Sequence, residues 1–220
     1  MNTNSVEARV FWEIIGGFAT AMDENSDYLT ALDAAIGDGD HGRNMAHGFA
    51  SVREELPTLG RVGIGPLLRA VGLNLVSSVG GASGPLYGAV FIEAGIAAGP
   101  VPRVDLPDLA RMMRAGCDAL VRRGRCKVGD KTIMDALAPA TAALEAAAAQ
   151  QATLLEAVQA SVSAAHEGML ATIPLVARCG LAMQYGERSA GHQDPGATSC
   201  YLLLNSIQRT IMRLGMERVR

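Results

Sequence analysis

Apolar residues recur along most of the chain with the 3.6-residue period of an amphipathic α-helix. Leu29, Leu32 and Ile36, for example, are spaced three and four residues apart and share one face of a predicted helix. There is no sustained alternation of period two, and no shift in composition marks a domain boundary. We expect one all-α domain over residues 1–220. Its eight or nine helices are predicted at about 4–22, 26–37, 43–56, 65–79, from 83 onward, 105–123, 132–150, 153–179 with an interruption at Pro174, and 194–215.

Several predicted helix ends carry residues that typically cap helices. Residues 4–7 read as a capping box and predict a helix start near residue 4. Ser83, Asp105 and Asp194 are predicted N-caps, each with a proline in the first turn that follows. Pro139 is a predicted kink inside a helix.

Composition and charge narrow the range of functions. Aromatic residues make up 4% of the chain and the net charge is −3, so neither a stacking platform nor a basic surface for nucleic acid is expected. No apolar run approaches the roughly 18 residues of a membrane span, and no secretory signal precedes the first helix, so we expect a cytoplasmic protein. The cysteines are widely spaced without a zinc-site pattern. We expect them to be reduced thiols, mostly packed as small hydrophobic residues: Cys117, Cys126, Cys179 and Cys200.

Three carboxylates, those of Asp33, Asp38 and Asp40, lie within eight residues in a glycine-rich segment. Carboxylates that converge from a helix end and a tight loop suit a hard cation such as Mg²⁺. Asp33 falls in the last turn of a predicted helix, where a negative charge is disfavoured, so we expect positive charge beside it. The spacing does not fit an EF-hand. The alternative is a polar turn in which the aspartates cap their own backbone.

Three further segments combine glycine with polar residues at predicted helix ends. Residues 77–88 suit either a phosphate-binding helix start or tight helix packing. Residues 122–132 contain a basic run that is either a solvated helix end or a phosphate contact. It is not a P-loop, because an aspartate separates the glycine from the lysine. In residues 186–199, Asp194 is either an N-cap or part of a binding site.

Taken together, the four segments resemble the nucleotide-binding L subunit of dihydroxyacetone kinase, the DhaL or DAK2-domain family. The resemblance rests on Ile36–Gly42, Ser78–Leu86, Gly129–Thr132 and Gly186–Ala197, which follow the order of the family's motifs. It spans residues 33 to 198, and therefore most of the chain. The resemblance implies a barrel of eight antiparallel amphipathic helices, with the nucleotide held by the loops at one end.

The resemblance also implies a set of ligands and site residues. It implies ADP or ATP, and two Mg²⁺ ions held by Asp33, Asp38 and Asp40. The family's phosphate-side contacts correspond to His41, Gly42, Arg43, Asn44, Ala82 and Ser83. Its other nucleotide contacts correspond to Gly124, Ile133, Asp194, Pro195 and Gly196. No catalytic residue is implied beyond the metal ligands.

The family implies a kinase subunit that works only with a partner. A K subunit holds dihydroxyacetone covalently on a histidine, and the L subunit presents the phosphoryl group. In phosphotransferase-system versions an M subunit rephosphorylates bound ADP, whereas other versions exchange free ATP, and related kinases act on tetruloses. Leu181 stands where the family commonly has an arginine that contacts the nucleotide. The alternatives are a non-catalytic nucleotide-dependent sensor and a helical Mg²⁺-dependent hydrolase.

Overall fold

The computed structural model describes residues 5–59 and 62–217 and places most of them in helices. The α-helices are α1 (Ala8–Glu24), α2 (Ser26–Ile36), α3 (His41–Glu55), α4 (Ile64–Ser78), α5 (Ser83–Ala98), α6 (Leu106–Gly124), α7 (Met134–Ala149), α8 (Leu154–Ala171) and α9 (Pro195–Glu217). The remaining described elements are the 3₁₀ helices η1 (Leu56–Leu59) and η2 (Leu181–Ser189) and the strands β1 (Ser5–Glu7) and β2 (Arg103–Asp105). The predicted all-α class is confirmed. Of the described helices, none is both long and apolar enough to cross a membrane.

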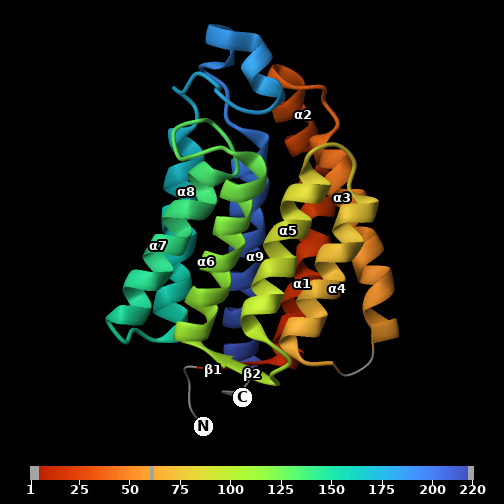
Figure 1. The fold of residues 1–220 in the computed structure, drawn as a ribbon, viewed down its shortest axis with the longest axis vertical. Helices are drawn as coiled ribbons and strands as arrows, with labels where there is room; N and C mark the ends of the chain where they lie inside the picture. Colours follow the sequence, from red (N-terminus) through yellow and green to blue (C-terminus); the bar gives the residue numbers. More distant parts are fainter. Residues whose placement is uncertain (1–4, 60–61, 218–220) are drawn as a thin grey trace.

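The long helices lie side by side and alternate in direction (Figure 1). Helix α1 packs against α3, each helix from α3 to α9 packs against the next, and α9 packs against α1, so that the contacts close a ring. Beyond this ring of neighbours, the expected barrel of eight antiparallel helices stays a prediction. The connections α2–α3, α4–α5, α6–α7 and α8–α9 all lie at the end that is uppermost in Figure 1. Four segments far apart in the sequence therefore meet at one end of the molecule.

The first helix begins later than the sequence predicted, because Ser5–Glu7 forms a strand. β1 pairs antiparallel with β2, and Val6 lies opposite Val104. Both valines are buried, so the small sheet closes the lower end of the molecule over the core. The predicted capping box was therefore wrong for Ser5–Glu7, and Asn4 lies outside the described residues. Strands this short carry no readable period-two pattern.

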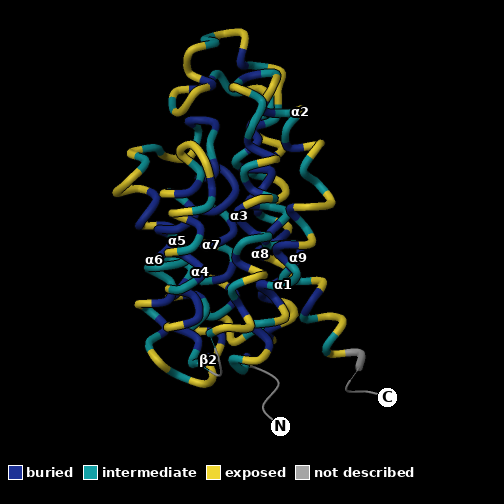
Figure 2. Tube along the Cα trace, turned by 90° about the vertical axis from the view of Figure 1, so that its right-hand side faces the viewer, coloured by how far each residue is buried: buried dark blue, intermediate teal, exposed yellow. Residues whose placement is uncertain are grey.

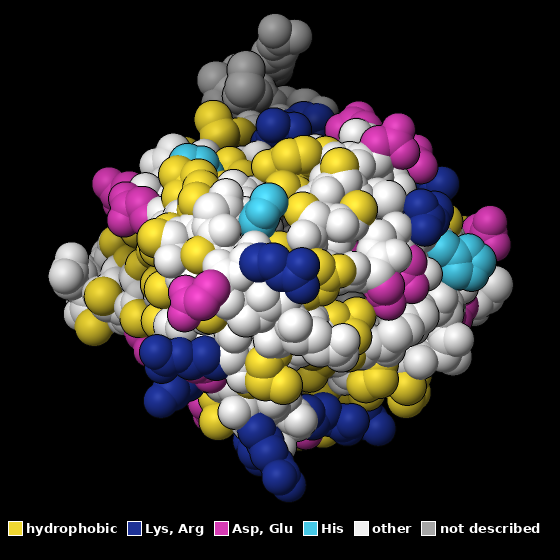
Figure 3. Space-filling view, turned by 90° about the horizontal axis from the view of Figure 1, so that it is seen from above, with side chains coloured by type: hydrophobic (Ala, Val, Ile, Leu, Met, Phe, Trp, Pro, Cys, Tyr) yellow, Lys and Arg dark blue, Asp and Glu magenta, His cyan; other side chains and the backbone are white. Residues whose placement is uncertain are grey.

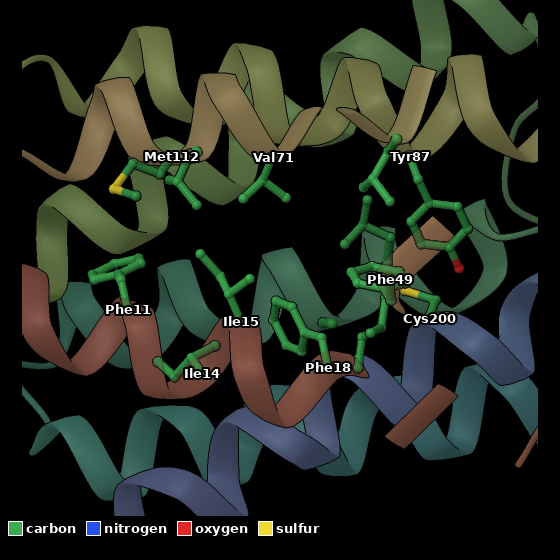
Figure 4. Packing of buried hydrophobic residues seen from close by; sticks show 14 of the residues in the cluster. Phe11, Ile14, Ile15, Phe18, Phe49, Val71, Tyr87, Met112 and Cys200 are labelled. Atoms are coloured by element: carbon green, nitrogen blue, oxygen red, sulfur yellow. The ribbon is translucent and has the colours of Figure 1, made fainter. Parts of the chain in front are cut away.

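The inward faces of the helices share one hydrophobic core (Figures 2 and 4). Phe18, Phe49 and Phe91 meet edge to face, with ring centroids 5.9 to 6.2 Å apart. Helices α4 and α5 approach closely through glycines, since a Cβ at Gly72 would lie 2.6 Å from the carbonyl oxygen of Gly88. An apolar cavity of about 190 Å³ remains inside the ring. The interior is thus apolar, and the polar segments gather at its upper end.

Residues 172–194, which we name the cap segment, cover part of that upper end (Figure 1). The sequence predicted a helical pattern over 153–179 with an interruption at Pro174, and α8 ends shortly before that proline, at Ala171. Thr172 is buried there, and its hydroxyl accepts a hydrogen bond from the backbone N–H of Asp194 at 3.0 Å. The hydroxyl of Tyr185 donates to the carbonyl of Gly37 at 2.9 Å. Both ends of the cap segment are therefore anchored, and its middle rests on the loop after α2.

The predicted helix caps hold at two of three positions. The side chain of Asp105 accepts from the backbone N–H of Asp108 at 2.9 Å as part of a capping box. The side chain of Asp194 accepts from the backbone N–H of Ala197 at 2.6 Å. Ser83 is instead the first residue of α5 and makes no cap, because its hydroxyl contacts a side chain of α3.

Candidate functional site

The three aspartates singled out in the sequence converge where α2 ends and α3 begins. One carboxylate oxygen each from Asp33, Asp38 and Asp40 lies within 4.8 Å of the other two. Asp33 is buried in the last turn of α2, whereas Asp38 is exposed in the loop. We name these three residues the acidic trio.

Backbone groups supply positive charge beside Asp33. Its Oδ2 accepts from the backbone N–H of Asp40 at 2.9 Å and from that of His41 at 3.1 Å. The N-terminus of α3, with its partial positive charge, therefore faces this carboxylate. These bonds hold the carboxylate of Asp33, on α2, against the start of α3, which Asp40 immediately precedes.

The residues of the acidic trio suit a hard divalent cation. Around Mg²⁺ the ligand oxygens lie about 2.0–2.1 Å from the ion, and hence about 3–4 Å from one another. The trio spans only slightly more than this, and the exposed side chain of Asp38 can turn inward. Gly37 closes on the trio so tightly that a Cβ there would collide with the carboxylate of Asp33. A glycine at 37 is therefore required for the loop to wrap this carboxylate.

Three helix N-termini meet beside the trio, around the side chain of His41. The Nδ1 of His41 lies 3.1 Å from the hydroxyl of Ser83 at the start of α5. Its Nε2 lies 2.9 Å from the hydroxyl of Ser199 in the second turn of α9. Burial lowers the pKa of His41 and favours the neutral imidazole. The positive ends of α3, α5 and α9 thus point into one region, which is a favourable place for an anion.

Backbone donors at two of these N-termini are available to such an anion. Among the described residues, the backbone N–H groups of Gly42 and Arg43 in α3, and of Ser83 and Gly84 in α5, have no hydrogen-bond acceptor. The carboxylates of the acidic trio suit a cation, and the free N–H groups beside them suit an anion. The two ligands would lie next to each other, so the cation can bind the anion as well as the trio. Phosphate with Mg²⁺ has this chemistry.

The remaining residues expected on the phosphate side are close by. Asn44 lies against Gly80, where a Cβ would come within 3.0–3.1 Å of the asparagine side chain. The Arg43 side chain is exposed and donates to the carbonyl of Gly39 at 2.8 Å. Ala82 is exposed and immediately precedes α5. Gly42 is buried, and a Cβ there would collide with the backbone of α2.

The expected nucleotide contacts farther from the phosphates form a second group. A Cβ at Gly196 would lie 3.1 Å from Oδ2 of Asp194 and 3.5 Å from the backbone nitrogen of Ile133. Pro195 and Asp194 are both buried, and burial raises the pKa of Asp194 to about 7. Gly124 ends α6 and lies near Leu86 of α5 rather than in contact with this group.

The basic run of residues 122–132 is divided between solvent and interior. Its arginines are exposed, but the side chain of Lys131 is only 1% exposed. Its Nζ donates to the carbonyl of Thr172 at 2.6 Å and to the carbonyl of His192. Neither reading of the run, as a solvated helix end or as a phosphate contact, applies to Lys131. It holds the two ends of the cap segment to the loop before α7.

Two of the four cysteines are paired. Cys126, after α6, and Cys179, in the cap segment, form a disulfide. The expectation of four reduced thiols was wrong for this pair and holds for Cys117 and Cys200, which are free and buried. The partners are 53 residues apart in sequence, and only the fold brings them together.

The sequence analysis missed the polar side chains behind the site. The hydroxyl of Tyr87 lies 2.7 Å from that of Ser199, and both residues are buried. Tyr87 occupies an ordinary apolar position of α5, and only its contact across to α9 distinguishes it. Seen from above, the site end carries acidic, basic and histidine side chains among hydrophobic ones (Figure 3).

Comparison with known proteins identifies close relatives. A profile of the DAK2 domain matches residues 35–209. The chain is 43% identical to the ADP-binding subunit of the PEP-dependent dihydroxyacetone kinase of Escherichia coli (strain K12), and the match covers 83% of this chain and 87% of that protein. It is 38% identical to the ADP-binding subunit of PEP-dependent dihydroxyacetone kinase 2 of Listeria innocua, over 94% of this chain and 97% of that protein.

A solved structure has the same arrangement of helices. The dihydroxyacetone kinase from C. freundii in complex with AMP-PNP and Mg²⁺ matches with a TM-score of 0.69 at 25% identity. The match covers 94% of this chain but 34% of that one, so the present chain spans about a third of that kinase.

Proposed function

Since the chain belongs to the DAK2 domain family, we propose that it is the ADP- or ATP-binding subunit of a cytoplasmic dihydroxyacetone kinase, with residues 1–220 as one nucleotide-binding domain. The observation that carries the proposal is the acidic trio beside the open N-termini of α3 and α5. The relatives named as ADP-binding subunits support the same reading.

In this proposal the acidic trio holds Mg²⁺, with two ions as the working number. The backbone of His41, Gly42, Arg43 and Asn44 and the segment Ala82–Ser83 bind the phosphates. Gly124, Ile133 and Asp194–Gly196 contact the rest of the nucleotide. Bound Mg²⁺ would neutralise charge on the phosphates, which is a large part of what phosphoryl transfer requires.

The protein's own groups contribute orientation. Asp33 is held by two backbone N–H groups, so a trio ligand is positioned before any ion binds. The fixed N–H groups at the starts of α3 and α5 present donors that need no reorganisation when a phosphate arrives. The cap segment is anchored through Lys131 and the disulfide and lies over part of the site end.

At the site end, the described residues include no separate set of polar side chains for a small polyol. The polar clusters at the site end are engaged with the trio, the helix N-termini or the cap segment. A ketose is small, so dense and specific contacts are needed to position it for transfer. We therefore assign the ketose to a K-type partner subunit that docks over the site end. An M-type phosphotransferase subunit is a further partner if bound ADP is rephosphorylated in place.

The metal assignment is tested with Asp38→Asn, which removes a charge and keeps the shape. We expect calorimetry to show a strong loss of ADP affinity in the presence of Mg²⁺, and ADP to lose its stabilising effect on thermal unfolding. Asp118→Asn, an exposed change on α6, is the matched control and should bind ADP as the wild type does. Unchanged binding by Asp38→Asn would remove Asp38 from the site.

The kinase assignment is tested by reconstitution. The purified chain with Mg²⁺, ATP and dihydroxyacetone should form no dihydroxyacetone phosphate above background. Addition of the cognate K-type subunit should start turnover, and Asp40→Asn should abolish it. Erythrulose in parallel assays separates a tetrulose kinase from a dihydroxyacetone kinase. Nucleotide binding without turnover on any K-type subunit would favour the sensor, and turnover by the isolated chain would overturn the subunit assignment.

A further inference from the structure

A chain of hydrogen bonds runs from the core to the mouth of the site. The hydroxyl of Tyr87 lies 2.7 Å from that of Ser199, Ser199 lies 2.9 Å from Nε2 of His41, and Nδ1 of His41 lies 3.1 Å from the hydroxyl of Ser83. We name these four residues the relay. It begins and ends on α5 and passes through α9 and α3, so its members belong to three different helices.

Burial gives the relay an inner and an outer end. Ser199 is fully buried, and Tyr87 and His41 are 4% and 8% exposed. Ser83 is half-buried, at the start of α5 beside N–H groups that have no acceptor among the described residues. The inner members can form hydrogen bonds only with other groups of the protein, whereas Ser83 lies at the proposed phosphate-binding site.

The number of hydrogens in the relay limits what Ser83 can offer. Each hydroxyl has one hydrogen, and a neutral imidazole has one donor and one acceptor nitrogen. If Tyr87 donates to Ser199 and Ser199 donates to Nε2, the imidazole hydrogen is on Nδ1 and points at Ser83. The hydroxyl hydrogen of Ser83 is then directed away from His41.

The opposite arrangement is also sterically available. The hydroxyl of Ser199 lies 3.1 Å from the carbonyl oxygen of Gly196, to which it can donate instead. Nε2 would then carry the hydrogen, and Ser83 would donate to Nδ1. In that arrangement the Ser83 side chain shows only lone pairs to an incoming phosphate oxygen, which also has only lone pairs.

On the basis of the proposed function, we propose that Tyr87, Ser199 and His41 are positioning residues that make the hydroxyl of Ser83 a hydrogen-bond donor to the bound phosphates. With phosphate present, all relay donors point outward, and the aligned dipoles strengthen one another. No proton enters or leaves the protein, because the hydrogen that Nδ1 carries is the one that Nε2 lacks. The relay thus connects a buried tyrosine, whose hydroxyl also lies 3.3 Å from the carbonyl oxygen of Gly196, to the phosphate pocket.

The direct test is nitrogen NMR of the His41 imidazole in the protein bound to ADP and Mg²⁺. We expect the signature of a neutral ring with hydrogen on Nδ1. A ring with hydrogen on Nε2 in the bound state would overturn the proposal. Ser206→Ala, which removes another buried hydroxyl of α9 outside the relay, should leave both the signals and the ADP affinity unchanged.

A double-mutant cycle tests whether the inner residues act through Ser83. Ser199→Ala and Ser83→Ala should each weaken ADP binding by about three- to tenfold, and together by no more than the larger single effect. Tyr87→Phe, which keeps the buried ring, should show the same dependence on Ser83. Ser199→Thr, which keeps the hydroxyl, should recover the affinity lost in Ser199→Ala.

The outcomes separate this proposal from the one on which it rests. Additive effects of Ser199→Ala and Ser83→Ala on ADP affinity would overturn the relay and leave nucleotide binding intact. Failure of the wild type to bind ADP with Mg²⁺ would overturn both. If Ser199→Ala does not fold, the cycle with Tyr87→Phe decides the question by the same criterion.

Discussion

The Nζ of Lys131 donates to the backbone carbonyl of Thr172 at 2.6 Å from a side chain that is almost completely buried. Thr172 begins the cap segment, and the second carbonyl bound by Lys131, that of His192, lies near its end. Burial lowers the pKa of this lysine, so its enclosure has an energetic cost that the hydrogen bonds to the two carbonyls offset. One side chain thus binds both ends of the cap segment to the loop before α7.

Replacing Lys131 with methionine should loosen the cap segment. The variant keeps the length of the side chain but leaves two carbonyls without this donor, so we expect the free energy of unfolding to fall by about 1–3 kcal/mol. Denaturant titration measures this loss, and hydrogen exchange should show faster exchange within residues 172–194. Lys127→Met, an exposed change in the same loop, is the matched control. Equal stability of the two variants would contradict the anchoring role.

Local signals in the sequence were sufficient to predict most of the α-helices. The spacing of Leu29, Leu32 and Ile36 places them on one face, and α2 begins and ends within one residue of the predicted helix. The N-caps Asp105 and Asp194 were also predictable, because a cap is a contact between residues three apart. The grouping of the acidic trio followed from the same proximity along the chain.

Contacts between distant residues were not predictable in this way. The pairing of β1 with β2, the disulfide and the relay each join segments that only the complete fold brings together. Lys131 is the clearest example, because a lysine in a basic run has the sequence signature of an exposed residue. Its burial depends on carbonyls about 40 and 60 residues farther along the chain.

A change at position 181 should slow the release of ADP. Leu181 is exposed at the start of η2, in the cap segment, and a charged hydrogen bond to phosphate is worth roughly 1.5–3 kcal/mol. We expect Leu181→Arg to release ADP roughly tenfold or more slowly than the wild type, measured by stopped-flow displacement of a fluorescent analogue. The wild type should lose ADP on dialysis.

Met183, exposed two residues farther along, provides the control for added charge. Met183→Arg should change ADP release less than Leu181→Arg, because position 181 is the one that we expect to correspond to the family's arginine. Wild-type protein that keeps stoichiometric ADP through extensive dialysis would contradict the expectation of ready exchange. This retention is the result expected if the side chain of Arg178 contacts the phosphate in place of the family's arginine.

The stability of the nucleotide-free protein should depend on Asp194. Burial raises its pKa to about 7 from an ordinary value near 3.8, so the folded state holds this proton more tightly than the unfolded state. The free energy of unfolding should therefore decrease as the pH rises from about 4 to about 7, by a few kcal/mol at most, and then level off. Asp194→Asn keeps an oxygen acceptor for the Ala197 N–H and should remove this decrease.

Thermal unfolding between pH 4 and 8 measures this dependence as the difference between variant and wild type. The difference is needed because burial lowers the pKa of His41, which makes stability rise with pH over part of the same range. Asp118→Asn, at an exposed position, should keep the wild-type profile. Parallel profiles for Asp194→Asn and the wild type would show that Asp194 does not titrate with a raised pKa.

The Cys126–Cys179 disulfide should stabilise the fold and be removable by reductant. Its two cysteines are 53 residues apart in sequence. By reducing the entropy of the unfolded chain, a crosslink over this separation raises the free energy of unfolding by about 4 kcal/mol at most. We expect dithiothreitol to lower the free energy of unfolding and the melting temperature, because the cap segment is then held only by non-covalent contacts, such as those of Lys131 and Tyr185. The double variant Cys126→Ser/Cys179→Ser should match the reduced wild type and show no further response to reductant.

Thiol titration of the unfolded, unreduced protein should detect two thiols, those of Cys117 and Cys200, and four after reduction. Four reactive thiols before reduction, or a melting temperature that reductant does not change, would show that the two sulfurs are not bonded in solution.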